Sequence, residues 1–112
     1  MIDAENGQPP ACNLAAMDAE ERIRYNHICD SLRKAVKKVE GLPQGYRFSF
    51  DNEPELLVMA VRFVTLESRC CPFYHFTIEQ SSYGGAIHLS ITGPAGTRQF
   101  IEAVIGPRRS VT

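Results

Sequence analysis

The sequence predicts an α+β domain with the element order α-β-α-β-β-α, in which three antiparallel strands carry helices on one face. Apolar residues recur at helical spacing in three segments, and they alternate with polar residues in three others. Because each predicted strand has one apolar and one polar face, we expect helices on one side only. The expected strand order is 1-3-2, as in a ferredoxin-like split β-α-β unit that lacks its last strand.

The first predicted helix begins near Asp18, where the stretch "DAEE" forms a capping box with Glu21. It ends before Gly41 and Pro43. Such a helix is about 33 Å long, whereas the predicted strands are about 20 Å long. The excess length favours a contact between two copies, so we expect a homodimer. The apolar stripe of this helix contains Tyr25, Ile28, Leu32, Ala35, Val36 and Val39.

A strand and a second helix follow. Three aromatic residues of "YRFSF", residues 46–50, alternate with polar residues, as in a half-buried strand. The stretch "DNEPE" predicts the start of a helix, with Asp51 or Asn52 as the N-cap and a proline in the first turn. This helix extends to about Cys71, where Pro72 makes its continuation unfavourable.

The remaining elements are a β-hairpin and a short helix. The stretch "HFTIEQSSYGGAIHLSIT" alternates on both sides of Gly84 and Gly85, which supply the positive φ that a tight turn requires. Gly93 and Pro94 precede the last predicted helix, which ends at the pair "GP" of residues 106–107. Its expected buried residues are Phe100, Ile101, Val104 and Ile105.

The length and the charge of the chain are those of one small globular domain. We expect this domain at residues 17–106, with an N-terminal tail at residues 1–16 and a C-terminal tail at residues 107–112. The chain has 112 residues and a net charge of −1, which does not favour nucleic acid or an anionic membrane as a partner. No apolar run approaches the roughly 18 residues of a membrane span, and the first residues lack the features of a signal peptide. We expect a cytoplasmic protein, whose four cysteines are thiols or metal ligands rather than structural disulfides.

Glu67 is the unexpected residue of the second predicted helix. At about 100° per residue, it lies in the middle of the apolar stripe, between Cys70 and Cys71. A buried carboxylate must be paired, protonated or bound to a cation. One interpretation is that it bonds backbone amides or an arginine such as Arg22 or Arg24. The other is a compact functional site made of the glutamate and the two cysteines.

The position of the two thiols at a helix C-terminus favours metal binding over nucleophilic chemistry. Reactive thiolates are usually found at helix N-termini, where the helix dipole lowers their pKa. The partial charge at a C-terminus is negative, which disfavours free thiolates and favours a cation. Two thiolates with a carboxylate suit a thiophilic ion such as Zn²⁺, Cu⁺ or Hg²⁺. No pattern in the sequence indicates an organic cofactor.

Other potential ligands are weaker candidates. Cys29 lies beside the apolar stripe of the first helix and joins the pair if that helix packs on the second; otherwise it is a small buried apolar residue. Cys12 lies in the N-terminal tail, from which it could fold over the site. His75 is close to the pair in sequence, but strand alternation places it on the polar face. His27 and His88 are expected to be exposed.

A wider sequence motif includes the same candidate site residues. The stretches "LESRCCPFYHFTIE" and "IHLSITGPAGTRQFI" resemble a group of small, largely uncharacterised bacterial proteins with the motif E-x-x-C-C-P-F, a hairpin, and G-P-x-G before a closing helix. The likeness covers roughly residues 46–105, and it implies an association with heavy-metal-responsive regulators. Cys12 and Cys29 are not part of this pattern. The matching positions are Glu67, Cys70, Cys71, Pro72, Phe73, Gly93, Pro94 and Gly96.

The sequence therefore predicts a protein that binds a thiophilic metal ion through Cys70 and Cys71, with Glu67 as a ligand or as a supporting group and Cys29 as a further candidate ligand. Buffering, delivery and sensing of the ion are all compatible with this hypothesis. One alternative is an enzyme that uses a cysteine for redox or transfer chemistry, with Glu67 as its base. Another is a dimeric interaction module in which the cysteines belong to the core.

Overall fold

The computed structural model describes residues 16–81 and 83–105, with side chains described up to residue 102. The predicted tails lie outside these residues, apart from residue 16, and so does Cys12. Among the helices of the described part, none has the length and apolar character of a membrane span. The elements in chain order are α1 (Ala19–Ala35), β1 (Lys38–Leu42), β2 (Gly45–Phe50), α2 (Pro54–Cys70), β3 (His75–Glu79), β4 (Ile87–Thr92) and α3 (Thr97–Ile105).

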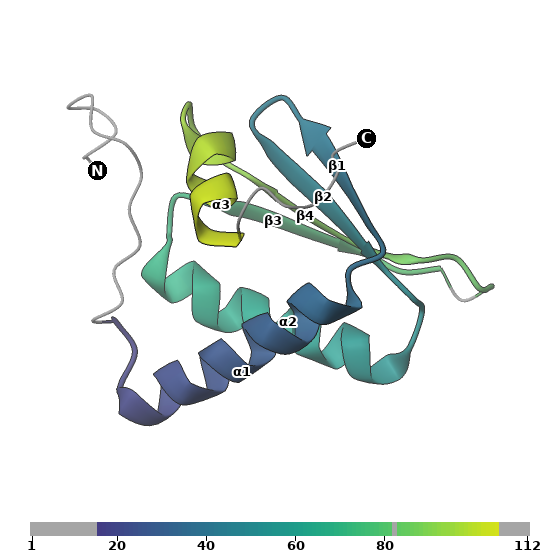
Figure 1. Ribbon diagram of the computed structural model, residues 1–112, viewed down its shortest axis with the longest axis horizontal. Coiled ribbons are helices and arrows are strands. Elements are labelled where there is room, and N and C mark those ends of the chain that lie inside the picture. The colour runs from purple at the N-terminus through teal and green to yellow at the C-terminus, as the bar shows by residue number, and fades with distance from the viewer. Residues whose placement is uncertain (1–15, 82, 106–112) are drawn as a thin grey trace.

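The strands form one antiparallel sheet with the order β1-β2-β4-β3 (Figure 1). β4 pairs with β2 on one side and with β3 on the other, both antiparallel. β2 and β3 therefore run parallel to each other with β4 between them, and α2 connects them, which makes a split β-α-β unit. The predicted order of these three strands is confirmed.

The prediction of only three strands is wrong, because the end of the first predicted helix is a strand. α1 ends at Ala35, and the extended Val36 is its C-cap, with φ −62° and ψ 128°. Residues 38–42 then pair with β2, and Val39 lies opposite Phe48. Valine suits a pleated strand better than a helix. α1 has 17 residues and is about 26 Å long, so the length that favoured a homodimer is absent and the homodimer stays a prediction.

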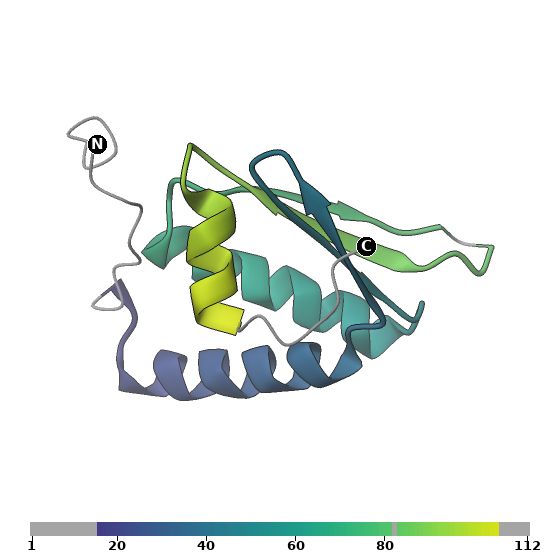
Figure 2. The same cartoon turned by 45° about the horizontal axis from the view of Figure 1, so that its top comes forward.

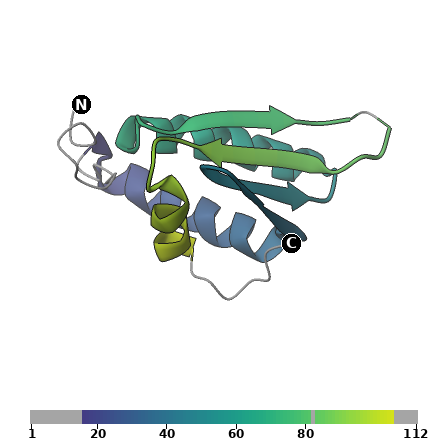
Figure 3. The same ribbon diagram turned by 90° about the horizontal axis from the view of Figure 1, so that it is seen from above.

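The helices cover one face of the sheet, as predicted (Figures 2 and 3). The opposite face is polar. On it, Arg47 forms an ion pair with Glu40 at 3.5 Å, and the Ser49 hydroxyl lies 2.9 Å from His88 Nδ1. The covered face carries one continuous core, which contains Ile28, Leu32, Val39, Tyr46, Phe48, Phe50, Ile87, Leu89, Ile91 and Ile101.

The two helix starts differ from each other. The capping box of α1 is present, since Asp18 accepts from the Glu21 amide at 2.8 Å and its own amide donates to the Glu21 carboxylate at 3.1 Å. The predicted N-cap of α2 is wrong: Glu53 occupies that position and makes no side-chain capping bond. Asn52 instead donates to the Ser81 carbonyl oxygen at 2.6 Å. A tertiary contact with the β3–β4 connection therefore replaces the local cap.

The close approach of β2 and β4 requires a glycine at position 45. Gly45 lies opposite Thr92, and a Cβ atom there would collide with the backbone carbonyl of Ile91. We expect Gly45→Ala to lower the free energy of unfolding by about 2–4 kcal/mol, because backbone atoms must move. Urea denaturation followed by circular dichroism measures this loss.

Gly84→Ala is the matched control for that change. Gly84 has a φ of +80°, but nothing lies within 4 Å of a Cβ atom at this position. The control should therefore cost only the roughly 1–2 kcal/mol of a residue with positive φ. A loss at Gly45 that does not exceed the loss at Gly84 would show that the sheet adjusts to the added methyl group.

Candidate metal centre

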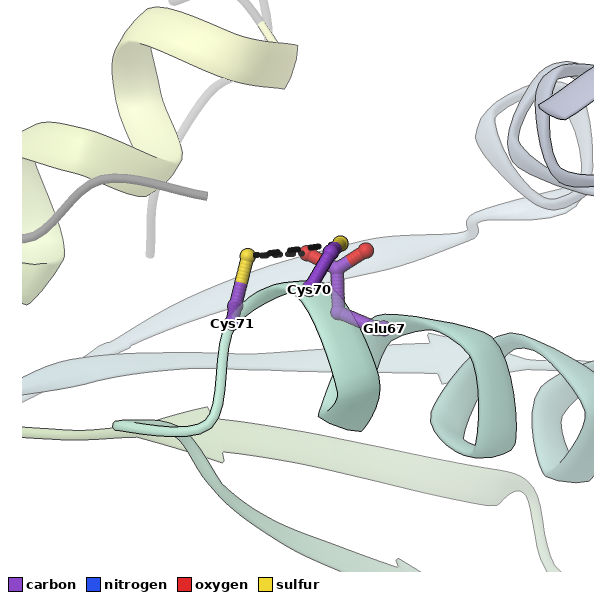
Figure 4. Close-up of side chains that lie close together, drawn as sticks. All are labelled: Glu67, Cys70 and Cys71. Atoms are coloured by element: carbon purple, nitrogen blue, oxygen red, sulfur yellow. Dashed lines mark hydrogen bonds between the residues drawn. The ribbon is translucent and has the colours of Figure 1, made fainter. Parts of the chain in front are cut away.

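The candidate site lies at the C-terminal turn of α2. The Cys71 amide donates to the Glu67 carbonyl oxygen at 2.7 Å and closes the last turn, and the chain then leaves the helix with φ −129° at Cys71. Pro72 explains this exit, since proline disfavours helical geometry in the residue before it. The side chains of Glu67, Cys70 and Cys71 project from the same side of this turn (Figure 4).

These three side chains converge as predicted, and they are referred to below as the triad. One ligand atom from each lies within 4.8 Å of the others. Cys70 Sγ is 3.8 Å from Cys71 Sγ, which in turn is 3.4 Å from Glu67 Oε2. Both cysteines are 0% exposed and Glu67 is 4% exposed, so the predicted burial of the carboxylate is confirmed. The triad is therefore a small cluster of metal-ligating atoms that water does not reach.

The cysteines differ in oxidation state. Cys29 and Cys70 are free, whereas Cys71 is disulfide-bonded. The expectation that all cysteines are thiols or metal ligands is therefore wrong for Cys71 in this form of the protein. Its sulfur can act as a metal ligand only after reduction, because a metal-ligating cysteine is a thiolate. Any metal bound by the whole triad thus belongs to the reduced protein.

Tyr25 of α1 belongs to the site, although the sequence analysis placed it only in the apolar stripe of the first helix. A hydrogen bond links its side chain to Glu67, and another links it to Cys29. Arg22 and Arg24, the expected partners of the carboxylate, are exposed. A local signal for this contact exists in the sequence: Tyr25 and Cys29 are four residues apart, and residues at this spacing lie on the same face of a helix.

Burial raises the pKa of the ionisable side chains of the site. Burial raises the pKa of Glu67, and the hydrogen bond from Tyr25 offsets only part of that effect. Burial, with a smaller contribution from the charge of Glu67, raises the pKa of Cys70 to about 11. Burial also raises the pKa of Cys29 to about 11. At neutral pH these thiols carry their protons, which is the opposite of an activated nucleophile.

Sulfur and aromatic side chains enclose the triad. Met17, which precedes α1, is 3% exposed and packs with the two cysteines. An ion pair of 2.6 Å between Arg69 and Glu21 joins the end of α2 to the start of α1. The rings of Phe73 and Phe100, 5.9 Å apart, also pack against the two cysteines. The start of α1 and the body of α3 are therefore parts of the site.

The glycines of the second motif position α3. A Cβ atom at Gly93 would lie 3.2 Å from the carbonyl oxygen of Phe73, so glycine allows the two segments to approach closely. Gly96 has a φ of 96°, which glycine adopts without strain and which lets the chain enter α3. Thr97, the first residue of the helix, donates from its hydroxyl to the Pro94 carbonyl oxygen at 2.6 Å. The motif thus brings Phe100 over the triad.

The other sequence candidates lie apart from the triad. Cys29 is partly buried and reaches the surroundings of Glu67 through Tyr25, and its role as a further ligand stays a prediction. His75 and His27 are exposed, as predicted. His88 is partly buried on the polar face of the sheet, where it contacts Ser49.

Comparison of the chain with protein-family models, with curated proteins and with solved structures gives no match. The resemblance to proteins with the motif E-x-x-C-C-P-F therefore stays a prediction. The function is argued below from the geometry of the site.

The buried carboxyl group should make the stability of the metal-free, reduced protein depend on pH. Because the pKa of Glu67 is raised above its ordinary value of 4.5, its contribution is complete below that value and is lost as the pH rises through the folded-state pKa. We expect Glu67→Gln, which resembles the protonated form, to remove this loss. Urea denaturation at several pH values above 4.5 measures the effect.

Glu79→Gln on the exposed side of β3 is the matched control, because it makes the same chemical change where no burial occurs. It should retain the pH dependence of the unsubstituted protein. An unchanged pH dependence in Glu67→Gln would show that the carboxyl group titrates in the folded protein as it does in the unfolded chain.

Proposed function

We propose that the reduced protein binds a thiophilic metal ion, such as Zn²⁺, Cu⁺ or Hg²⁺, through the thiolates of Cys70 and Cys71. Glu67 acts as a third ligand or supports the thiolates. The observation that carries this proposal is the convergence of the three ligand atoms within 4.8 Å in a buried position. Binding suits the buffering, delivery or sensing of such an ion.

The separations within the triad support a bent arrangement around one ion. Two sulfurs that each lie about 2.3 Å from a tetrahedral ion are about 3.8 Å apart, and the measured distance from Cys70 Sγ to Cys71 Sγ is 3.8 Å. A sulfur and a carboxylate oxygen on the same ion are about 3.5 Å apart, and Cys71 Sγ lies 3.4 Å from Glu67 Oε2. A linear S–metal–S unit would need about 4.6 Å.

Charge balance supports a cation rather than free thiolates. Three ionised groups in a buried cluster would repel one another and would lose their hydration, which is prohibitive without a counter-charge. The C-terminal end of α2 adds a partial negative charge beside them. A divalent or monovalent cation offsets these charges, and it replaces protons that the buried groups otherwise hold. A cytoplasmic location, which stays a prediction, would keep the thiols reduced.

The two alternative functions have less support. A redox or transfer enzyme needs a thiol with a lowered pKa, whereas burial raises the pKa of Cys70 to about 11. An interaction module with core cysteines accounts for the burial of Cys70, but apolar packing does not require a carboxyl group among the sulfurs. We therefore infer a metal-binding role for the triad.

Single substitutions should separate the ligands from their surroundings. We expect Cys70→Ser and Cys71→Ser each to weaken binding of Zn²⁺ or Hg²⁺ by more than the roughly 10- to 100-fold that a supporting group contributes. Glu67→Gln should fall within that range if the carboxylate supports the thiolates, and beyond it if the carboxylate is a ligand. Metal titration of the reduced protein measures these affinities.

Cys29→Ser is the matched control, since it makes the same change in a free, partly buried cysteine outside the triad. An effect as large as that of Cys70→Ser would make Cys29 a ligand. Circular dichroism checks that every variant is folded. The proposal fails if the reduced protein binds none of the three ions, or if neither triad cysteine affects the affinity.

Metal binding should release protons and depend on pH. Because burial holds the pKa of Cys70 at about 11, the thiol must lose its proton to the solvent when the ion binds near neutral pH. We expect the affinity to rise by roughly tenfold per pH unit for each thiol that is deprotonated. Calorimetric titrations in buffers of different ionisation enthalpy count the protons released. A pH-independent affinity would contradict ligation by Cys70.

A further inference from the structure

A cavity of about 100 Å³ lies between the covered face of the sheet and the three helices. Apolar side chains form most of its wall. Leu32 comes from α1, Phe63 from α2 and Ile101 from α3, while Phe48 and Leu89 come from the sheet. A mostly apolar wall favours apolar guests over water, because water beside it finds few polar partners.

Part of the cavity wall is polar, and one of its residues, Glu67, also belongs to the triad. Glu67, Tyr25 and Cys29 line the cavity together with Tyr74. Glu67 also belongs to the cluster whose ligand atoms lie within 4.8 Å of one another. An ion held by the triad would therefore adjoin a mostly apolar space that favours hydrocarbon over water. An apolar group attached to a soft metal would fit this juxtaposition of a candidate metal site with an apolar space.

We propose that the site takes a thiophilic metal that carries one small alkyl group, with the metal on the thiolates and the alkyl group in the cavity. This inference rests on the metal-binding function proposed above. The bent arrangement of the two sulfurs leaves room for a further bond at the metal, and an alkyl carbon can occupy it. The apolar wall then stabilises the alkyl group by removing it from water.

The exchange that loads the site is balanced without any further reactant. A metal that carries an alkyl group and a small thiolate forms bonds to the sulfurs of Cys70 and Cys71, and its bond to the small thiolate breaks. The proton of one protein thiol passes to the departing thiolate, and the proton of the other passes to the solvent. The metal–carbon bond and the oxidation states do not change.

The volume of the cavity limits the size of the alkyl group. An apolar cavity of about 150 Å³ holds a benzene molecule. The cavity here, at about 100 Å³, has room for a chain of about two to four carbons by the same measure. Affinity should therefore rise from a methyl to an ethyl group and then decline for groups that exceed this space.

Competition with glutathione tests the inference on the full, reduced chain. Methylmercury and ethylmercury are partitioned between the protein and glutathione, and mass spectrometry measures the bound fraction. The ratio of protein-bound to glutathione-bound alkylmercury is compared for the two cations. Because glutathione provides the same metal–sulfur bond, this ratio reports the stabilisation that the rest of the protein site contributes. We expect the ratio to be about fourfold larger for ethylmercury, as one buried methylene predicts. Cys70→Ser should abolish this preference, and a preference that persists in Cys70→Ser would overturn the inference.

Filling the cavity gives the second arm of the test. Val39 lines the cavity, whereas Val58 is 49% exposed on α2, so Val39→Phe and Val58→Phe are a matched pair. Val39→Phe should lower the ethylmercury ratio to that of methylmercury and leave Hg²⁺ binding intact, and Val58→Phe should change neither. If Val39→Phe is unfolded by circular dichroism, Leu32→Phe fills the same cavity from α1.

The outcomes distinguish this inference from the function on which it rests. The alkyl-metal inference is overturned if the two alkylmercury cations give equal ratios, or if a folded cavity-filled variant retains the ethyl preference. In either case, binding of Hg²⁺ would continue to support the metal site. Failure of the protein to bind Hg²⁺ would overturn both. Loss of the ethyl preference together with retained Hg²⁺ binding supports both.

Discussion

The burial of the Glu67 carboxyl group is the constraint on which the rest of the site depends. This side chain is only 4% exposed, and its contacts come from the Tyr25 hydroxyl of α1 and from Cys71, the residue that ends α2. A buried carboxyl group is tolerated only while its polar atoms have partners. The relative positions of α1 and α2 are therefore tied to the chemistry of a single side chain, and a displacement of either helix would expose or isolate it.

The local sequence at the end of α2 builds the enclosure around that carboxyl group. Pro72 stops the helix immediately after the two cysteines, and the amide of Tyr74 donates to the Cys71 carbonyl oxygen at 3.1 Å. Gly93 then allows the chain to pass close to Phe73, so that α3 delivers Phe100 to the same place. Two short motifs that are about 20 residues apart thus act on one site, the first by supplying its sulfurs and the second by covering them.

The same burial supports the proposal of a metal site over that of a covalent intermediate. It raises the pKa of Cys70 to about 11, so that this thiol carries its proton at neutral pH, and it raises the pKa of Glu67 as well. The same carboxyl group contributes part of the wall of the neighbouring, mostly apolar cavity. In the function and the inference proposed above, this apolar surrounding favours an ion that neutralises the charge and an apolar group attached to that ion.

The sequence by itself determined the features that depend on residue spacing, which are the three helices and the strands β2 to β4. It also determined the placement of Glu67 beside Cys70 and Cys71, because the direction of a side chain around a helix follows from its position alone. Only the tertiary structure decided that residues 38–42 are a strand, since their pattern also fitted the preceding helix and pairing with β2 selected the extended form. The contact of Tyr25 with Glu67, the cavity and the oxidised state of Cys71 also became evident only from the structure. The contact and the cavity join segments that are far apart in the chain, and no local pattern specifies the distance between such segments.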